Sequence, residues 1–363
     1  MPTVLDWSPT VDPSELVRVI REVVAAGSAV VLPGDCGYVV LINPLGPNAP
    51  AQLAALAEAT PAPPAVLAWS ADDPEGLGLP VSEVGRRLMF RGWPAPLVAA
   101  VPGVPEWPAD WPAAVRDRVA AAGAVRFRCP DHPLLEALVP ALELPTLVVD
   151  TFLPTAEAAL DAVNDESAVA VSVGERPAEG EPTVVTLAAG GYELTRPGLF
   201  PADEVERFAA RLVLFVCTGN TCRSPLAEAL AKKALADRLG CGADELPRRG
   251  VWVLSAGVAA HGGGPASEES VAVAAEFGAD LGGHESRLVN PQLLAAADDV
   301  VTMTRGHAEA LLARYPGVGP RPRLLCGDAD LDDPIGAGLD VYRACAQTIL
   351  THLERLLPEW TGQ

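Results

Sequence analysis

The chain has 363 residues, which is enough for two domains that each bury a core of their own. Its net charge of −21 at pH 7 opposes binding to the phosphates of nucleic acids, and no apolar stretch is long enough to span a membrane. The first ten residues lack the basic and apolar segments of a signal peptide, so we expect a cytoplasmic protein.

The negative charge is concentrated in the first part of the chain. Residues 1–205 contain 27 acidic and 11 basic residues, a net charge of −16, whereas residues 206–363 contain 20 and 15, a net charge of −5. The first part contains no lysine. The seven cysteines follow neither a disulfide-scaffold spacing nor a metal-ligand spacing, so no metal site is expected. We expect two domains, residues 1–205 and 206–363, joined by a short connection.

The first part alternates helical and strand patterns. Apolar spacing predicts a helix from Asp12–Pro13 to Ala26 and a strand over 29–32. A second helix is predicted over 51–59. Further strands are predicted over residues 66–69, 97–101, 124–127, 146–149 and 169–173. This alternation indicates an α/β domain with a mixed, twisted sheet.

Five motifs in this part stand in the order of a known family. They are LPGDCGYVV (32–40), RGWPAPLVAAV (91–101), VRFRCPDHP (125–133), PTVV (182–185) and TRPG (195–198). Together they resemble the threonylcarbamoyl-adenylate synthase family, a fold of tRNA modification, over nearly all of residues 10–200. The resemblance implies that family's fold, and it makes Asp35, Arg128 and Arg196 candidates for a nucleotide site.

Other features of that family are missing. Its Lys-x-Arg pair, which holds phosphate and bicarbonate, is replaced by Ala-Glu-Ala-Thr-Pro-Ala-Pro-Pro after the second helix, and its Ser-Ala-Asn motif is absent near Val149–Thr151. A nucleoside triphosphate needs cationic partners. We therefore expect a degenerate synthase, with His132 as a structural loop residue. Two alternatives stay open: an active synthase that uses ATP, and a nucleotide-sensing regulatory module.

The second part opens on a strand, a loop and a helix. Leu212–Val216 read as a buried parallel strand, and Ser224–Pro225 as the N-cap and first position of a helix. Cys217 and Arg223 flank the loop at a spacing of Cys-x5-Arg. Successive N–H groups and the helix dipole suit a tetrahedral dianion, which Arg223 can grip with its planar fork. The same positive field favours a thiolate nucleophile at Cys217.

The run CTGNTCRSP resembles the active loop of the low molecular weight phosphotyrosine phosphatases, and the arginine phosphatases of that family in particular. The resemblance covers about residues 210–360 and implies a four-stranded parallel sheet. It also implies an enzyme that needs no cofactor and acts on phosphorylated proteins. It assigns phosphate binding to the loop between the strand and the helix. Two interpretations of Cys222 stay open: it traps oxidised Cys217 in a reversible disulfide, or it is a small buried apolar residue. The loop residues in question are Thr218, Gly219, Asn220, Thr221, Cys222 and Ser224.

Later segments complete this pattern. Strands are predicted over 251–254, 299–302 and 323–326, and helices over 267–277 and 339–357. His284 is expected to organise its loop. In LDDPIG (331–336), Asp333 precedes proline as in the family's Asp-Pro loop, so it is the candidate general acid, with Asp332 as the lesser one.

Two positions bear on the substrate. The resemblance to arginine phosphatases includes Thr221 and the run GLDVY (338–342), whereas tyrosine enzymes commonly have a bulkier aliphatic residue at the former position. Ile335 follows Asp-Pro, where tyrosine enzymes usually have an aromatic wall and arginine phosphatases often have Phe, so it departs from both groups. The loss of the wall weakens the phosphotyrosine case more. Phosphoarginine is therefore favoured over phosphotyrosine. Arsenate reductase shares the fold, but Cys326 and Cys345 lack the close spacing of a cysteine relay.

Overall fold

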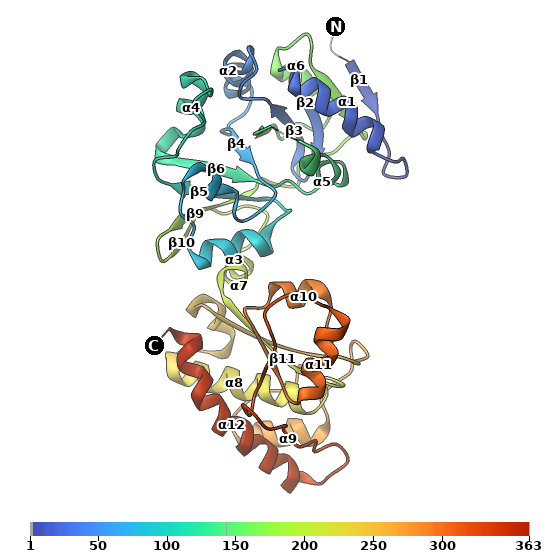
Figure 1. Cartoon of the computed structure of the whole chain (residues 1–363), viewed down its shortest axis with the longest axis vertical. Helices are drawn as coiled ribbons and strands as arrows, with labels where there is room; N and C mark the ends of the chain where they lie inside the picture. The colour runs from blue at the N-terminus through green and yellow to red at the C-terminus, as the bar shows by residue number, and fades with distance from the viewer. Residues whose placement is uncertain (1–2, 143, 363) are drawn as a thin grey trace. The chain divides into compact units, whose positions relative to one another are not determined.

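The computed structural model describes residues 3–142 and 144–362. The chain divides into two compact units, one ending at Phe208 and the other beginning at Ala209 (Figure 1). The division falls at the end of helix α7 (Ala202–Ala209), three residues beyond the boundary expected from the sequence. Within the described residues, no helix has the length and apolar character needed to cross a membrane.

The N-terminal unit is built on a ten-stranded sheet of order β1-β8-β2-β3-β7-β4-β6-β5-β9-β10. Parallel and antiparallel pairs alternate irregularly along it, so the predicted mixed sheet is confirmed. Its strands are β1 (Thr3–Asp6), β2 (Val30–Gly34), β3 (Gly37–Ile42), β4 (Ala65–Leu67), β5 (Leu97–Pro102), β6 (Ala124–Arg128), β7 (Leu147–Asp150), β8 (Val169–Ser172), β9 (Thr183–Ala188) and β10 (Gly191–Arg196).

Apolar strand residues and helices form the core of this unit. Val30 and Leu32 of β2 and Val39 and Leu41 of β3 are buried in one cluster with Ile20 of the first helix. The alternation is that of paired strands, in which every second side chain points to the same face. The helices are α1 (Ser14–Ala25), α2 (Ala49–Ala59), α3 (Glu83–Gly92), α4 (Ala113–Val119), α5 (Pro133–Leu138) and α6 (Ala156–Val163).

The C-terminal unit has a four-stranded parallel sheet of order β12-β11-β13-β14, as the sequence predicted. Its strands are β11 (Arg211–Cys217), β12 (Val251–Gly257), β13 (Asp299–Thr302) and β14 (Arg323–Leu324). Its helices are α8 (Arg223–Leu239), α9 (Glu268–Glu276), α10 (Pro291–Ala296), α11 (Arg305–Arg314) and α12 (Leu339–Thr361).

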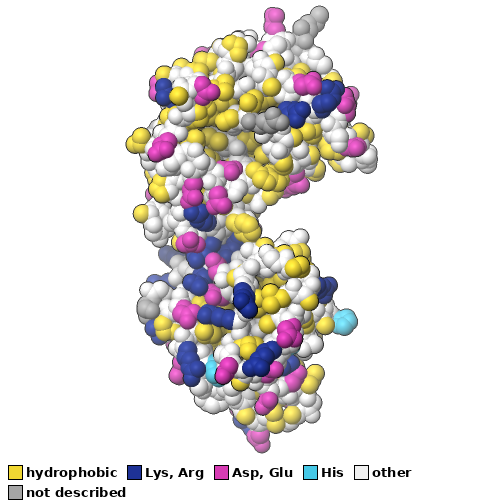
Figure 2. Space-filling view, viewed as in Figure 1, with side chains coloured by type: hydrophobic (Ala, Val, Ile, Leu, Met, Phe, Trp, Pro, Cys, Tyr) yellow, Lys and Arg dark blue, Asp and Glu magenta, His cyan; other side chains and the backbone are white. Residues whose placement is uncertain are grey.

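Strand β11 is buried on both faces, which explains its continuous apolar sequence. Val213 and Phe215 pack into the cluster that contains α8, α9 and α12, whereas Leu212 and Leu214 pack into the cluster that contains α10 and α11. The strand therefore lies at the centre of the unit and fixes the position of its last residue, Cys217 (Figure 1). On the face shown in Figure 2, basic and acidic side chains are interspersed over this unit.

Candidate active site

The loop after β11 carries the candidate nucleophile. Cys217 is the last residue of the strand and is 3% exposed, and helix α8 begins six residues later at Arg223. The predicted N-cap at Ser224 is wrong: Cys222 is the N-cap residue, and Ser224 lies inside the first helical turn. The Ser224 hydroxyl has other partners, namely the Cys217 sulfur at 3.0 Å and the Ala256 carbonyl at 3.3 Å.

Two polar groups reach the Cys217 sulfur. One is the Ser224 hydroxyl, and the other is the backbone N–H of Asn220, which donates from 3.2 Å. Asn220 has a φ of 56°, in the left-handed region that asparagine tolerates better than most residues. This turn of the backbone folds the loop around the sulfur.

The side chain of Asn220 ties the loop to the neighbouring strand. Its Nδ2 donates to Ser224 Oγ at 2.9 Å and to Ser255 Oγ at 2.8 Å, and its Oδ1 accepts from the Arg287 N–H at 2.9 Å. Ser255 in turn donates to Glu228 Oε2 at 2.6 Å. Asn220 is fully buried, so satisfied hydrogen bonds at all its polar atoms fix the loop in one arrangement.

Sequence reasoning identified Asn220 but missed Glu228 and the role of Ser255. Glu228 is 7% exposed and lies in a run of small and apolar residues, Leu226–Ala231, in which every residue is buried. An acidic residue inside such a run indicates a buried carboxylate with a partner, because an isolated buried charge is costly. The single acidic residue in this apolar run of α8 is the sequence feature that could have identified Glu228.

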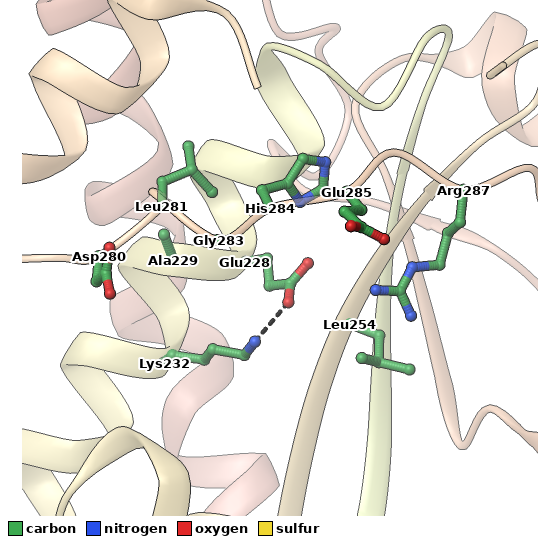
Figure 3. A pocket seen from close by; sticks show the side chains of 10 residues that line it. All are labelled: Glu228, Ala229, Lys232, Leu254, Asp280, Leu281, Gly283, His284, Glu285 and Arg287. Atoms are coloured by element: carbon green, nitrogen blue, oxygen red, sulfur yellow. Dashed lines mark hydrogen bonds and ion pairs between the residues drawn. The ribbon is translucent and has the colours of Figure 1, made fainter. Parts of the chain in front are cut away.

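Glu228 also faces a small pocket of about 270 Å³, shown in Figure 3. Its second oxygen pairs with Lys232, one helical turn along. His284, in the wall of the same pocket, donates from Nε2 to the Asn220 carbonyl at 2.8 Å, which agrees with a loop-organising role. The ten residues around the pocket are Glu228, Ala229, Lys232, Leu254, Asp280, Leu281, Gly283, His284, Glu285 and Arg287.

Arg223 and Asp333 lie in direct contact. The Arg223 guanidinium is 6% exposed, pairs through Nη2 with the Asp333 carboxylate and donates through Nη1 to the Leu331 carbonyl at 3.2 Å. The Asp333 side chain is 43% exposed. Asp332 is exposed and has no such contact among the described residues. The structure therefore places Asp333, from the loop before α12, against Arg223 at the end of the loop that follows Cys217.

His307 is hydrogen-bonded to Thr218, the first residue of the loop after Cys217. Its Nε2 bonds Thr218 Oγ1 at 2.9 Å, and its Nδ1 bonds Thr304 Oγ1 at 3.0 Å. Burial and the nearby positive charge of Arg223 lower the pKa of His307 to about 4, so the ring is neutral at pH 7. Sequence reasoning gave His307 no role.

The remaining loop residues differ in their surroundings. Thr221 is half-buried, and its carbonyl accepts from the Ser267 N–H at 2.8 Å. A Cβ added at Gly219 would meet only Thr221 Oγ1, at 3.6 Å, so crowding does not require glycine there. Cys222 is buried, with a free thiol that accepts from the Tyr342 hydroxyl at 3.4 Å. Cys217 is also a free thiol.

The candidates in the N-terminal unit fall into two places. Arg128 is fully buried, and its guanidinium pairs with Asp35, with Asp150 at 3.4 Å and with the Ala95 carbonyl. Arg196 forms no ion pair with this group among the described residues: it pairs with Glu181 at 2.8 Å, although it lines the same hollow as Asp150. His132 caps α5 by accepting from the Leu134 N–H, and burial lowers its pKa to about 4. Its expected structural role agrees with this geometry.

Comparison with known proteins divides the chain at the same place. Residues 212–362 match the family described as low molecular weight phosphotyrosine protein phosphatase. Residues 22–198 match the Sua5/YciO/YrdC family, described as telomere recombination. The two ranges do not overlap, so each unit has relatives of its own.

Individual relatives are similar to this chain over about two fifths of its length. The protein-arginine-phosphatase of Geobacillus stearothermophilus is 36% identical over 149 residues, which are 40% of this chain and 92% of that protein. The probable low molecular weight protein-tyrosine-phosphatase EpsP of Ralstonia solanacearum is 35% identical over 34% of this chain and 78% of its own length. A solved structure of the YwlE arginine phosphatase from Geobacillus stearothermophilus covers 41% of this chain and 92% of its own, with 35% identity and a TM-score of 0.36.

Proposed function

Because the chain belongs, through its C-terminal unit, to the low molecular weight phosphotyrosine protein phosphatase family, we propose that it hydrolyses phosphorylated protein side chains at Cys217, with phosphoarginine as the preferred substrate. The phosphatases of this family need no cofactor. The observation that carries the proposal is the Cys217 sulfur, which lies within hydrogen-bond distance of the Ser224 hydroxyl and the Asn220 N–H, in the loop that ends at Arg223. Such donors stabilise a thiolate more than a thiol.

The first chemical step transfers the phosphoryl group to sulfur. The Cys217 thiolate attacks phosphorus in line with the leaving group, the S–P bond forms and the bond to the leaving nitrogen breaks. Loop N–H groups and Arg223 hold the three equatorial oxygens. Asp333, as the carboxylic acid, gives its proton to the departing guanidine nitrogen, which leaves poorly without it.

The second step releases phosphate. The Asp333 carboxylate takes a proton from water, the water oxygen attacks phosphorus, and the S–P bond breaks to restore the Cys217 thiolate. The ion pair between Asp333 and Arg223 bears on both steps. A bound phosphoryl dianion competes for the same guanidinium, so its arrival frees Asp333 to move toward the leaving group. The 43% exposure of the Asp333 side chain leaves it room to do so.

Two side chains near the loop favour phosphoarginine over phosphotyrosine. Thr221 presents a half-buried side chain at the loop, small enough to admit a guanidine and able to hydrogen-bond with it. Ile335 is 69% exposed, so no aromatic ring follows Pro334 to stack on a tyrosine ring.

The test compares a phosphoarginine peptide and a phosphotyrosine peptide of one sequence, by steady-state kinetics, for the wild type and for Thr221→Ile. We expect kcat/KM to favour phosphoarginine in the wild type, and the Ile side chain to reduce this preference by about tenfold or more, because it removes the hydroxyl and fills the space beside the guanidine. Thr348→Ile, an exposed change on α12, is the matched control. A wild-type preference for phosphotyrosine, or no change in Thr221→Ile, would contradict the assignment of substrate.

For the N-terminal unit we infer a fold that has lost its synthase activity. Its one family-matched arginine near Asp35, Arg128, is already neutralised by two carboxylates, and the unit contains no lysine to replace the missing pair. Full-length protein given threonine, bicarbonate and ATP is expected to form no threonylcarbamoyl-adenylate. Product formation above that of a blank without protein would restore the bifunctional alternative.

A further inference from the structure

Thr218 is the exposed residue of the active loop, and a buried histidine holds its side chain. Of the five residues between Cys217 and Arg223, only Thr218 is exposed. His307 is 6% exposed, and its ring nitrogens bond Thr218 Oγ1 at 2.9 Å and Thr304 Oγ1 at 3.0 Å. Thr218 Oγ1 has no other hydrogen bond within the residues that the structure describes. A hydroxyl with two lone pairs and one proton thus keeps part of its hydrogen-bonding capacity unused.

Helix α11 places this histidine beside the segment that carries the general acid. At the start of the helix, the Arg305 N–H donates to Asp330 Oδ1 at 2.7 Å, a short way before Asp333 in the chain. The charges of Arg223, Asp333 and Asp330 all act on the His307 ring. The ring is therefore close to the ion pair of Arg223 and Asp333 as well as to the active loop.

The protonation of the ring decides what Thr218 offers to a ligand. The ring is neutral at pH 7, so one of its nitrogens donates and the other accepts. When Nδ1–H donates to Thr304 Oγ1, Nε2 accepts the proton of the Thr218 hydroxyl. Both lone pairs of Thr218 Oγ1 then stay available for donors that approach from solvent. The opposite tautomer, in which Nε2–H donates to Thr218, would occupy one of these lone pairs.

The two candidate substrates differ in what they present to such an acceptor. Phosphoarginine carries N–H donors on the guanidine nitrogens beside the phosphorylated one, whereas the ring of phosphotyrosine carries only C–H groups there. In-line attack places the leaving group opposite the Cys217 sulfur, toward the open side of the loop where Thr218 is exposed. An acceptor at this position favours a guanidine, because a site built to hydrogen-bond one substrate discriminates against an analogue without the donor.

We propose that Thr218 is a specificity-determining residue for phosphoarginine and that His307 is its positioning residue. In this arrangement His307 accepts the proton of the Thr218 hydroxyl, and Thr218 Oγ1 accepts from a guanidine N–H of the substrate. This role rests on the proposed function, because Thr218 contacts a guanidine only if phosphoarginine is a substrate. It adds to Thr221 a second hydroxyl for the guanidine, one that is fixed from outside the loop by α11.

Steady-state kinetics with phosphoarginine and phosphotyrosine peptides of one sequence test the contact. Thr218→Val keeps the shape of the side chain but removes its hydroxyl. We expect kcat/KM for phosphoarginine to fall by about tenfold, mainly through a higher KM, and kcat/KM for phosphotyrosine to stay within about threefold of the wild type. Thr351→Val, the same change at an exposed position of α12, is the control and should match the wild type on both peptides.

Variants of His307 test the positioning role. His307→Leu removes the acceptor for the Thr218 proton, so kcat/KM for phosphoarginine should fall by about fivefold. His307→Gln offers its amide oxygen in that place and should stay within about twofold of the wild type. The double variant Thr218→Val with His307→Leu should lose no more than Thr218→Val alone, because both changes remove one contact. Turnover of the phosphotyrosine peptide shows in each variant that the active loop is intact.

Four results would overturn the roles of Thr218 and His307 while leaving the phosphoarginine assignment in place. They are wild-type kcat/KM for phosphoarginine in Thr218→Val or in His307→Leu, equal losses for the two peptides, and additive losses in the double variant. A wild-type enzyme that hydrolyses phosphotyrosine but not phosphoarginine would overturn both the proposed substrate and this contact.

Discussion

The two units each bury an arginine beside a carboxylate, and the surroundings decide what each arginine can do. Arg223 is 6% exposed, and its one carboxylate partner, Asp333, has a side chain that is 43% exposed on a loop. Arg128 is fully buried, and its two partners, Asp35 and Asp150, have side chains that are 10% and 9% exposed. Both arginines are ion-paired, but only Asp333 is exposed enough to move away from its arginine.

The difference separates a binding arginine from a structural one. Replacing Asp333 by a phosphoryl group at Arg223 exposes a carboxylate that is already half in water, at little cost. The same exchange at Arg128 would leave two buried carboxylates without a cation, which is costly. An arginine matched to a family motif is therefore no guarantee of a ligand site: the number and burial of its partners must be known.

The largest expected effect lies in the N-terminal unit. Arg128→Leu should lower the free energy of unfolding of this unit by about 3–5 kcal/mol, because it leaves Asp35 and Asp150 buried without their cation. Hydrogen exchange of β5, β6 and β7 measures the loss. Arg126→Leu on the same strand is the control, with an expected change below about 1 kcal/mol, since Arg126 has no ion pair to lose. Equal losses of unfolding free energy in Arg128→Leu and Arg126→Leu would contradict a structural role for the ion pairs of Arg128.

The next effect lies at Arg223. Arg223→Lys should keep the fold but lower kcat/KM for a phosphoarginine peptide by about 10²–10³-fold, because lysine cannot hold two phosphoryl oxygens with a planar fork. Arg211→Lys, at the other end of β11 and paired with Asp299 at 2.6 Å, is the matched control. Its kcat/KM should stay within about threefold of the wild type. An Arg223→Lys enzyme of wild-type efficiency would show that the guanidinium does not bind the phosphoryl group.

The smallest effect concerns pH. The pKa of His307 is near 4 in the folded unit against an ordinary value of 6.5, so the unfolded chain binds the extra proton between these two pH values. Stability of the C-terminal unit should therefore fall as pH decreases from 6.5 to 4. Denaturant titrations at pH 6.5 and pH 4 measure the free energy of unfolding that is lost between these two values. This loss should be smaller by about 1 kcal/mol in His307→Gln than in the wild type, a figure that allows for solvent screening. The same pH dependence in both proteins would contradict the assignment.

The sequence predicted most of what lies along one strand or helix. The buried strand before Cys217 and strand 299–302 were both expected, because their apolar patterns are local. Strands β1, β3, β9 and β10 were missed. β10 is partly exposed, with Glu193 and Thr195 in its sequence, and pairing with β9 rather than an apolar pattern defines it.

What the sequence could not supply was the identity of partners. The motif placed Asp35 and Arg128 in one domain, but the pairing of Arg128 with Asp150, 22 residues further along, depends on the sheet order. The buried relay from Glu228 through Ser255 to Asn220 likewise joins a helix, a strand and a loop. Ser224 shows the same limit, since a local pattern assigned it to a helix cap while its hydroxyl lies against the Cys217 sulfur.

The most direct test of the phosphatase proposal is to find the phosphoryl group on the enzyme. The wild-type enzyme is mixed rapidly with a phosphoarginine peptide and quenched during turnover, and the position of the phosphoryl group is mapped by mass spectrometry. Because Asp333 is intact and supports both steps, the account predicts phosphocysteine at residue 217 during turnover, and none in Cys217→Ala. A phosphoryl group on another residue, or turnover by Cys217→Ala at the wild-type rate, would contradict it.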